Sequence, residues 1–438
     1  MIIAKFGGSS LAGAHQFNKV KSLVQNNPNR THIVVSAMGK DEANPVKLTD
    51  ELIALYDNRA NDELAAEHFE RIKVRLLTLK KDLALTVNLD YQLEDFYRNL
   101  NHLSYAECVS RGEYFTAQLM AEYLGYQFVD AIDFLVLNQN QVDLKSSQEK
   151  FAALNLQDTP CVFPGFYGLD NQGNMQLMPR SGSDTSGSVI ANLLDADLYE
   201  NWTDVAGIKA ADPRLIDNPK RIEQLTYDEL QELAYMGLSV FQEDAIKPIK
   251  DKNIPTRILD TNHPDALGTT ICNEFSNQLI TGLVGQQNYT IIHIKKFSLS
   301  RDYSNFVEIF KLMSDLSLAV SYTFSGKDHI DLIVESSQLN KNKALLFDKL
   351  QTLFPTDCQI TLKEDISLIA AVSDKFSAKP YLVSDLIEQL NQNEIDVQFV
   401  NQSSTDVKVL FGVKNDDYIK ALQLLYNYVE KKEKINLI

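Results

Sequence analysis

The sequence has little cysteine and no long hydrophobic segment. Its 4 cysteines, Cys108, Cys161, Cys272 and Cys358, stand too far apart for metal-ligand spacing or a disulfide framework. We therefore expect four buried free thiols in a reducing compartment. No apolar run approaches the ~20 residues that span a bilayer, and the opening MIIAKFGGSS lacks the pattern of a signal peptide. A cytoplasmic location is expected.

Positive charge is also scarce. The 438 residues include 42 Lys and Arg against 59 Asp and Glu, a net charge of -17. An acidic surface repels nucleic acid and anionic membranes, so we expect neither as a partner. It also repels an anionic substrate, so a site for one needs local cations. The 44% hydrophobic content is ordinary for a globular chain, and this length predicts roughly three domains.

Strand and helix signals alternate in the first part of the chain. Apolar residues Phe17, Val20 and Val24 recur at helical spacing, and 50–103 is long, charged and helical in pattern. Strands are expected at Ile2–Phe6, His32–Ala37, Tyr126–Asp130, Cys161–Phe166, Leu198–Thr203 and Ile254–Leu259. The alternation predicts a three-layer α/β domain with a mostly parallel sheet over residues 1–275.

Turn formers cluster at 261–277, and a shorter-period pattern follows. The order strand-helix-strand-strand-helix occurs twice there. Its expected elements are 291–295, 305–313, 317–323, 330–335 and 344–354, then 366–372, 381–390, 397–401, 407–413 and 418–429. We interpret the repeat as two ferredoxin-like α+β modules, 276–362 and 363–438.

Two segments have the composition of phosphate sites. Lys5-Phe6-Gly7-Gly8-Ser9-Ser10 ends the first strand; its glycines allow backbone N–H groups to approach a phosphate, and its lysine can neutralise one. A plain strand-to-helix turn is the alternative. In 178–195, Arg180 precedes a turn of small residues, and a helix is expected to begin near Ser183 or Asp184. Its N-terminus could bind phosphate, or Ser183 or Asp184 could simply be the N-cap.

Two further segments carry polar residues at strand ends or helix starts. WTDVAG at 202–207 and ADPR at 211–214 follow an expected strand, where ligands bind in open α/β sheets, although both also read as turns. Ser110-Arg111-Gly112-Glu113 has the spacing of a capping box. None of the 7 histidines has a metal-pair spacing or a nucleophile beside it. This disfavours hydrolases built on Ser-His or Cys-His pairs, and no resident metal ligands are assigned.

Taken in order, these segments resemble the aspartokinases of the amino acid kinase family. The resemblance rests on KFGGSS at 5–10, VVSAMGK at 34–40, SRGE at 110–113, RSGSD at 180–184, WTDVAGI with ADPR at 202–214, and NIPTRILDTNHPDALGT at 253–269. It covers essentially the whole chain.

The resemblance implies phosphorylation of the L-aspartate β-carboxylate by MgATP, giving 4-phospho-L-aspartate on the route to lysine, threonine and methionine. It implies that the C-terminal modules are ACT domains that bind an end-product amino acid, lysine or threonine, and that 279–285 could join the second module. A homodimer or a dimer of dimers is expected. The chemistry fits independently, because a carboxylate of pKa ~4 is already ionised at pH 7 and needs no general base.

By the same resemblance, the catalytic residues are Lys5, Asp184 and Arg180. Lys5 would hold the transferring phosphate, Asp184 would orient Lys5 or the substrate ammonium, and Arg180 would pair with the substrate α-carboxylate. The remaining roles are substrate binding by Ser36, Thr49, Glu113 and Ser183, and ATP binding by Gly7, Gly8, Ser9, Thr203, Asp204, Lys209, Arg214 and Ser239.

The sequence departs from the family pattern at a few positions. The usual RGGSD reads RSGSD, so Ser181 stands in place of a glycine; a positive φ there would cost about 1 kcal/mol. Lys209 replaces a frequent tyrosine, Ser239 a frequent lysine and Gln242 a nearby histidine. These changes concern the adenine side of the site.

Three other functions are considered. A kinase acting on glutamate, acetylglutamate or carbamate should lack the paired C-terminal modules. An amino-acid-sensing protein that has lost activity is compatible with the departures, although Lys5, Arg180 and Asp184 are all retained. A scaffold without activity is the third. For an effector, we expect binding between modules of paired subunits, near the polar segment VNQSSTD at 400–406.

Overall fold

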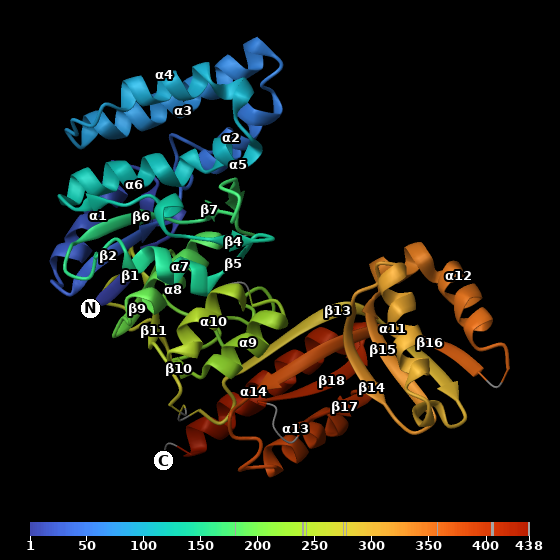
Figure 1. Cartoon of the computed structure of the whole chain (residues 1–438). Coiled ribbons are helices and arrows are strands. Elements are labelled where there is room, and N and C mark those ends of the chain that lie inside the picture. Colours follow the sequence, from blue (N-terminus) through green and yellow to red (C-terminus); the bar gives the residue numbers. More distant parts are fainter. Residues whose placement is uncertain are drawn as a thin grey trace. The chain divides into compact units, whose positions relative to one another are not determined.

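The computed structural model describes residues 1–179, 181–238, 241, 243–274, 276, 278–356, 358–403 and 407–436. The chain forms two compact units (Figure 1). Unit 1 consists of Met1–Lys209, Arg221–Ala234 and Ser239–Ser276. Unit 2 consists of Ala210–Lys220, Tyr235–Leu238 and Asn277–Ile438.

Unit 1 is built on an eight-stranded sheet in the order β10-β12-β11-β9-β1-β2-β6-β3. Six neighbouring strands, from β11 to β3, run parallel, and β12 and β10 run against them. The strands are β1 Ile2–Phe6, β2 Arg30–Val35, β3 Gln127–Phe128, β6 Cys161–Pro164, β9 Leu198–Thr203, β10 Gln224–Leu225, β11 Thr256–Asp260 and β12 Thr269–Ile271. Two hairpins accompany the sheet, β4 Leu137–Asn138 with β5 Gln141–Val142, and β7 Tyr167–Leu169 with β8 Met175–Leu177.

Helices cover both faces of this sheet. One layer contains α1 and α6, which contact each other and β2, and the other contains α8 and α10, with α8 lying on β1 and β9 (Figure 1). The helices of unit 1 are α1 Ala14–Gln25, α2 Leu48–Asp57, α3 Asp62–Asp82, α4 Leu89–Arg98, α5 Tyr105–Val109, α6 Arg111–Leu124, α7 Leu144–Ala152, α8 Gly182–Leu193, α9 Tyr227–Tyr235 and α10 Glu243–Asp251. The expected three-layer, mostly parallel α/β fold is confirmed.

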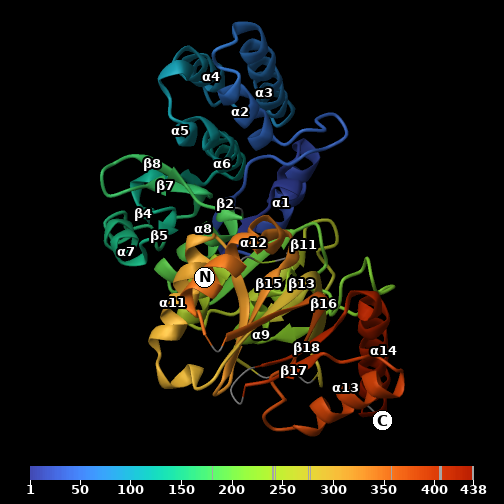
Figure 2. The same cartoon turned by 90° about the vertical axis from the view of Figure 1, so that its right-hand side faces the viewer.

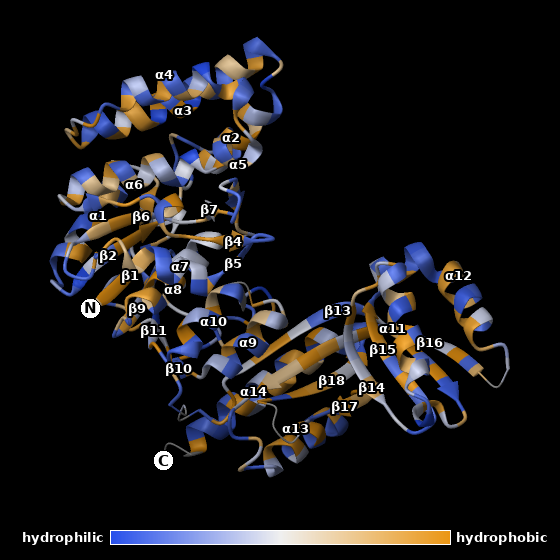
Figure 3. Cartoon of the chain, viewed as in Figure 1, coloured by the Kyte–Doolittle hydropathy of each residue, from blue (hydrophilic) through white to orange (hydrophobic). Residues whose placement is uncertain are grey.

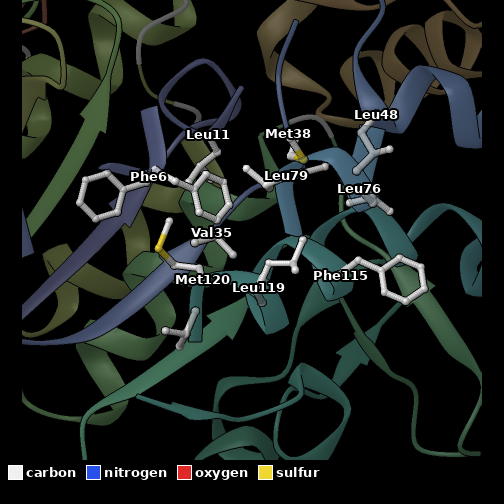
Figure 4. Close-up of a cluster of buried hydrophobic side chains, with 14 of the residues drawn as sticks. Phe6, Leu11, Val35, Met38, Leu48, Leu76, Leu79, Phe115, Leu119 and Met120 are labelled. Atoms are coloured by element: carbon white, nitrogen blue, oxygen red, sulfur yellow. The ribbon is translucent and has the colours of Figure 1, made fainter. Parts of the chain in front are cut away.

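The alternation of side chains along β1 determines where the chemistry lies. Ala4 and Phe6 belong to the hydrophobic core against α1 and α6, together with Val35, Leu119 and Met120 (Figure 4). Because successive strand residues point to opposite faces, Lys5 points toward the α8 layer. Burial of a side chain such as Phe6 contributes about 1.5–3 kcal/mol. Figure 3 shows β1 and β6 coloured mainly as hydrophobic. The core therefore fixes the strand that carries Lys5.

Unit 2 contains a six-stranded sheet in the order β14-β15-β13-β16-β18-β17. Its elements are β13 Gly282–Lys296, α11 Ser304–Asp315, β14 Val320–Ser325, β15 His329–Glu335, α12 Ser336–Leu353, β16 Cys358–Val372, α13 Tyr381–Gln392, β17 Phe399–Asn401, β18 Lys408–Lys414 and α14 Tyr418–Asn436. The predicted strand-helix-strand-strand-helix order occurs twice. Helices α13 and α14 pack side by side (Figures 1 and 2).

The two central strands of unit 2 are longer than the sequence suggests. The pattern predicts strands at 291–295 and 366–372, whereas β13 and β16 have 15 residues each. Gly282–Gln286 pairs with Leu368–Val372, and Ile291–Lys296 pairs with Cys358–Lys363. The stretches 286–290 and 358–365 were missed because they are rich in polar residues and contain Asn288 and Asp365, both at positive φ.

Other expectations need smaller corrections. The strand predicted at 126–130 reduces to β3 at Gln127–Phe128. The four cysteines are free, but only Cys108 and Cys161 are buried, whereas Cys272 and Cys358 are partly exposed. None of the described helices is long and apolar enough to cross a membrane.

Candidate active site

The first strand ends in a turn of closely packed backbone. The carbonyl oxygen of Gly8 accepts a 2.7 Å hydrogen bond from the N–H of Gly39, in the loop after β2. A Cβ atom at Gly39 would lie 2.5 Å from the carbonyl carbon of Gly8, and one at Gly8 would lie 2.8 Å from the carbonyl oxygen of Ala37. Glycine is therefore required at both positions. The turn presents backbone rather than side chains there, as close approach of a phosphate requires.

Lys5 forms a buried ion pair beside this turn. Its Nζ lies 2.6 Å from Oδ1 of Asp184, at the start of α8. Asn201, on β9, donates from Nδ2 to the same Oδ1 at 2.8 Å, and the Tyr199 hydroxyl donates to the Asp184 carbonyl oxygen at 3.2 Å. Lys5 and Asp184 are 6% and 8% exposed, so the pair is shielded from solvent. The cation of Lys5 is thus held at the carboxyl end of the central strand.

Helix α8 begins in a strained turn. Ser181 is its N-cap residue, with φ +63° and no side-chain capping bond. The sequence-based alternative, in which Ser183 or Asp184 is the N-cap, is wrong: both lie inside the helix, and the carboxylate of Asp184 faces Lys5. A Cβ at Gly165 would lie 2.8 Å from Cα of Ser183, so the chain after β6 packs directly against the helix start. The N-terminal amides of α8 and Lys5 therefore lie on one side of the sheet.

A second group of predicted residues gathers around the loop after β2. The N–H of Ser36 donates to the carbonyl of Phe6 at 3.1 Å. A Cβ at Gly112 would lie 2.9 Å from Cβ of Ala37 and 3.8 Å from Oγ1 of Thr49. The start of α6 is thereby brought against Ala37 and Thr49.

Glu113 places a buried carboxyl in this group. It is 4% exposed, and its Oε2 has no hydrogen-bond partner among the described residues. Burial raises the pKa of Glu113 to about 8, against the opposing effect of the hydrogen bond from the Ala37 N–H. The capping box predicted at Ser110 is wrong, because Ser110 makes no side-chain cap; the box is formed by Ser104 and Glu107. One oxygen of the Glu113 carboxyl is therefore buried without a hydrogen-bond partner among the described residues.

The residues predicted on the ATP side are more scattered. Thr203 ends β9, and its hydroxyl donates to Asp204 at 3.2 Å. Lys209 is exposed, and its backbone forms an isolated antiparallel β-bridge with that of Arg221. Arg214 belongs to unit 2, where its exposed guanidinium pairs with Asp212 at 2.7 Å. Arg180 and Ser239 lie outside the described residues.

Two residues near the site were missed by sequence reasoning. Asn201 is a polar residue at a buried position of β9, next to the equally buried Glu200, and Arg75 interrupts the apolar face of α3. A polar residue at an expected core position was the available signal in each case. Buried Arg75 donates to the carbonyl oxygens of Val46 at 3.0 Å and Ala12 at 3.2 Å, and also to that of Gly39. It therefore joins the loops that follow β1 and β2.

In the part of the chain that the structure describes, no group of three or more His, Cys, Asp or Glu side chains could hold a metal ion. Three histidines instead pair with single carboxylates: His68 with Glu51, His263 with Asp260 and His293 with Asp331.

Comparison with known proteins gives a consistent result. The model of the amino acid kinase family matches residues 1–260. Aspartokinase 3 of Bacillus subtilis (strain 168) is 31% identical over 445 residues, covering 97% of this chain and 98% of the relative. Lysine-sensitive aspartokinase 3 of Escherichia coli (strain K12) is 23% identical over 453 residues, covering 98% of both.

Solved structures agree with the sequence relatives. The crystal structure of Clostridium acetobutylicum aspartate kinase matches with a TM-score of 0.87 and 32% identity, covering 97% of this chain and 99% of that one. E. coli aspartokinase III in complex with aspartate and ADP matches with a TM-score of 0.76 and 22% identity, covering 98% and 99%; at that identity the likeness concerns the fold.

Proposed function

Because this chain belongs to the amino acid kinase family, as one of its aspartokinases, we propose that it transfers the terminal phosphoryl group of MgATP to the β-carboxylate of L-aspartate. The product is 4-phospho-L-aspartate, the first intermediate on the route to lysine, threonine and methionine. The observation that carries the proposal is the buried Lys5–Asp184 pair at 2.6 Å beside the glycine turn.

The reaction needs charge neutralisation rather than proton transfer. An oxygen of the ionised substrate carboxylate forms a bond to the terminal phosphorus, and the bond from that phosphorus to the ADP oxygen breaks. No proton changes place, so no general base is required. Two anions must meet within a protein of net charge -17. Lys5 supplies a fixed positive charge where they meet, an effect that contributes several kcal/mol in such sites.

The residues assigned to binding divide between the two substrates. Gly7, Gly8 and Ser9 cradle the phosphates of ATP, and Thr203, Asp204, Lys209, Arg214 and Ser239 bind the rest of the nucleotide. Mg²⁺ enters with ATP, bound to its phosphates. The closely packed turn of Gly8 and Gly39, which a Cβ would disrupt, supports this placement.

Aspartate binds on the side of the loop after β2. Glu113 receives its ammonium group, which would satisfy the buried Oε2 that has no partner among the described residues. Ser36, Thr49 and Ser183 donate hydrogen bonds to the carboxylate oxygens of the substrate. Arg180 pairs with the substrate α-carboxylate in a bidentate contact. Asp184 holds Lys5 toward the phosphoryl group.

The test is ATP-dependent formation of aspartyl hydroxamate by the purified full chain. Aspartate should give product and glutamate should not, which also separates this function from kinases of longer acidic substrates. Lys5→Met should lower kcat at least about 100-fold, since one cation at the transferring group is removed. Lys80→Met, which breaks an exposed ion pair with Asp90 on the helical layer, is the matched control and should keep kcat. No product from folded wild-type protein would rule out the kinase function.

For unit 2 we propose two ACT modules, 276–362 and 363–438, with 279–285 joining the second. The pairing of Gly282–Gln286 with Leu368–Val372 supports this division. An end-product amino acid, lysine or threonine, binds the modules of a homodimer or dimer of dimers; part of the segment expected to hold it, 404–406, lies outside the described residues. Calorimetry with lysine, threonine and methionine should give heat for at least one, and no heat for any would exclude this regulation.

A further inference from the structure

Asn201 stands directly beside the proposed catalytic lysine. In the parallel pairing of β1 with β9, Lys5 is the register partner of Asn201, so both side chains point to the same face of the sheet. Their donors converge on one atom: Nζ of Lys5 lies 2.6 Å and Nδ2 of Asn201 2.8 Å from Oδ1 of Asp184. Asp184 therefore has two donors from two neighbouring strands, one charged and one neutral.

Asn201 is a polar side chain at a buried position where a hydrophobic side chain would pack at lower cost. It is 3% exposed, and its Oδ1 accepts no hydrogen bond from the described residues. The amide orientation follows from the partner, because a carboxylate only accepts and so must face Nδ2. A buried amide with an unsatisfied oxygen is costly compared with a hydrophobic side chain of similar size. What the Asn201 amide provides in return is the Nδ2 hydrogen bond to Asp184.

We propose that Asn201 is a positioning residue for phosphoryl transfer, acting through Asp184 on Lys5. This inference rests on the proposed function of Lys5. When a phosphate approaches, the ammonium of Lys5 must divide its hydrogen bonds between that phosphate and Asp184. Asn201 keeps Oδ1 of the buried carboxylate bonded as Lys5 turns away. Without it, Lys5 would be the only side-chain donor to that oxygen among the described residues, and would be held back from the phosphate.

The first test compares two buried asparagines of unit 1. Asn201→Leu removes the donor to Asp184. Asn192→Leu is the matched control, because Asn192 is also 3% exposed and also donates one buried bond, 2.7 Å to the Pro248 carbonyl. Asn201→Leu should lower kcat about tenfold, equivalent to about 1.4 kcal/mol, and raise the KM for ATP more than that for aspartate. Asn192→Leu should lower thermal stability similarly and keep kcat. Equal kcat values for both variants would overturn the proposal.

The second test uses a charge in place of the donor. In Asn201→Asp, the groups facing the new carboxyl are Asp184 from α8, Lys5 from β1 and Tyr199 from β9. Two adjacent carboxyls share one proton, and the second ionisation moves to higher pH. At low pH the protonated Asp replaces the lost donor. At higher pH the added negative charge holds Lys5, so kcat should fall.

The pH profile separates positioning from general damage. Between about pH 5.5 and about pH 9, the ratio of kcat for Asn201→Asp to kcat for Asn201→Leu should fall as pH rises, whereas a structural defect would leave it constant. A constant ratio would contradict the inference. The failure of the proposed function is distinct, since the wild-type protein would then give no aspartyl hydroxamate at any pH.

Discussion

Ser181 keeps a left-handed conformation that serine adopts at a cost. Its φ is +63° at the N-cap of α8, so Ser181→Gly should stabilise the protein by about 0.5–1 kcal/mol. Thermal unfolding of the full chain measures this as a higher midpoint. The control in the same helix is Ser188→Gly, at a buried interior position where Oγ donates to the Thr185 carbonyl. That change should destabilise by about 1 kcal/mol; stabilisation by neither or both would contradict the role of φ.

Glu113 makes stability and substrate binding depend on pH. Burial raises its pKa from 4.5 to about 8, so between those values the folded state binds more protons than the unfolded state. Stability therefore falls as pH rises through this window, by up to about 1.4 kcal/mol per pH unit. Glu113→Gln should remove that slope in denaturation measured at several pH values.

The same group predicts proton release on binding. If the substrate ammonium ionises Glu113, aspartate binding at pH 7 should release a proton, which calorimetry detects as a heat that varies with the ionisation enthalpy of the buffer. Glu107→Gln is the control. The hydrogen bond from the Ser104 backbone lowers the pKa of Glu107, so this carboxyl is already ionised at pH 7 and its replacement should leave the buffer dependence of the heat unchanged. A buffer-independent heat in the wild type would exclude Glu113 as the ammonium ligand.

At the scale of elements, α3 holds the two loops of the site through Arg75. Its guanidinium bonds to the carbonyls of Ala12, Gly39 and Val46, and Gly39 packs against Gly8. Arg75→Met should cost about 3 kcal/mol in urea denaturation, since the carbonyls of Ala12 and Gly39 lose a buried charged donor and that of Val46 a partly buried one. Arg75→Lys should recover part of this. A loss of stability below about 0.5 kcal/mol for Arg75→Met would show that the two loops keep their conformation without Arg75.

The same scale shows what the sequence could predict. The apolar run 2–6 predicted β1, because burial on both faces of the sheet leaves little polar sequence. The Ser110 capping box was wrong because Ser110, between α5 and α6, has helical φ and ψ of −60° and −20°, and its Oγ donates to the Glu107 carbonyl instead of capping α6. Asn201 was missed because its partner lies 17 residues away on another element, a contact that no local pattern encodes. Lys5 and Asp184 were predicted by resemblance, and the structure places them in contact.

At the scale of the whole molecule, one part of the nucleotide-side sequence belongs to the C-terminal unit. In Ala210–Lys220, the Lys220 N–H donates to the Tyr426 hydroxyl at 2.8 Å, and the Lys220 ammonium lies 2.8 Å from Glu430. Loss of one such bond costs about 1 kcal/mol. Tyr426→Phe should therefore speed tryptic cleavage after Arg214 about fivefold. Tyr428→Phe, on the same helix, is the control and should leave the rate unchanged; equal rates in both would mean that Tyr426 does not secure this stretch.

The long strands β13 and β16 join the two repeats of unit 2 in one continuous sheet. Each strand supplies pairing for both repeats, so a cut between the repeats would divide the single six-stranded sheet and leave each part short of a strand. Neither half could be shed, swapped for an unrelated module or melted alone without exposing the hydrogen-bonding edge of the other. The two repeats are therefore expected to unfold together, and a destabilising substitution in either strand should lower the stability of both.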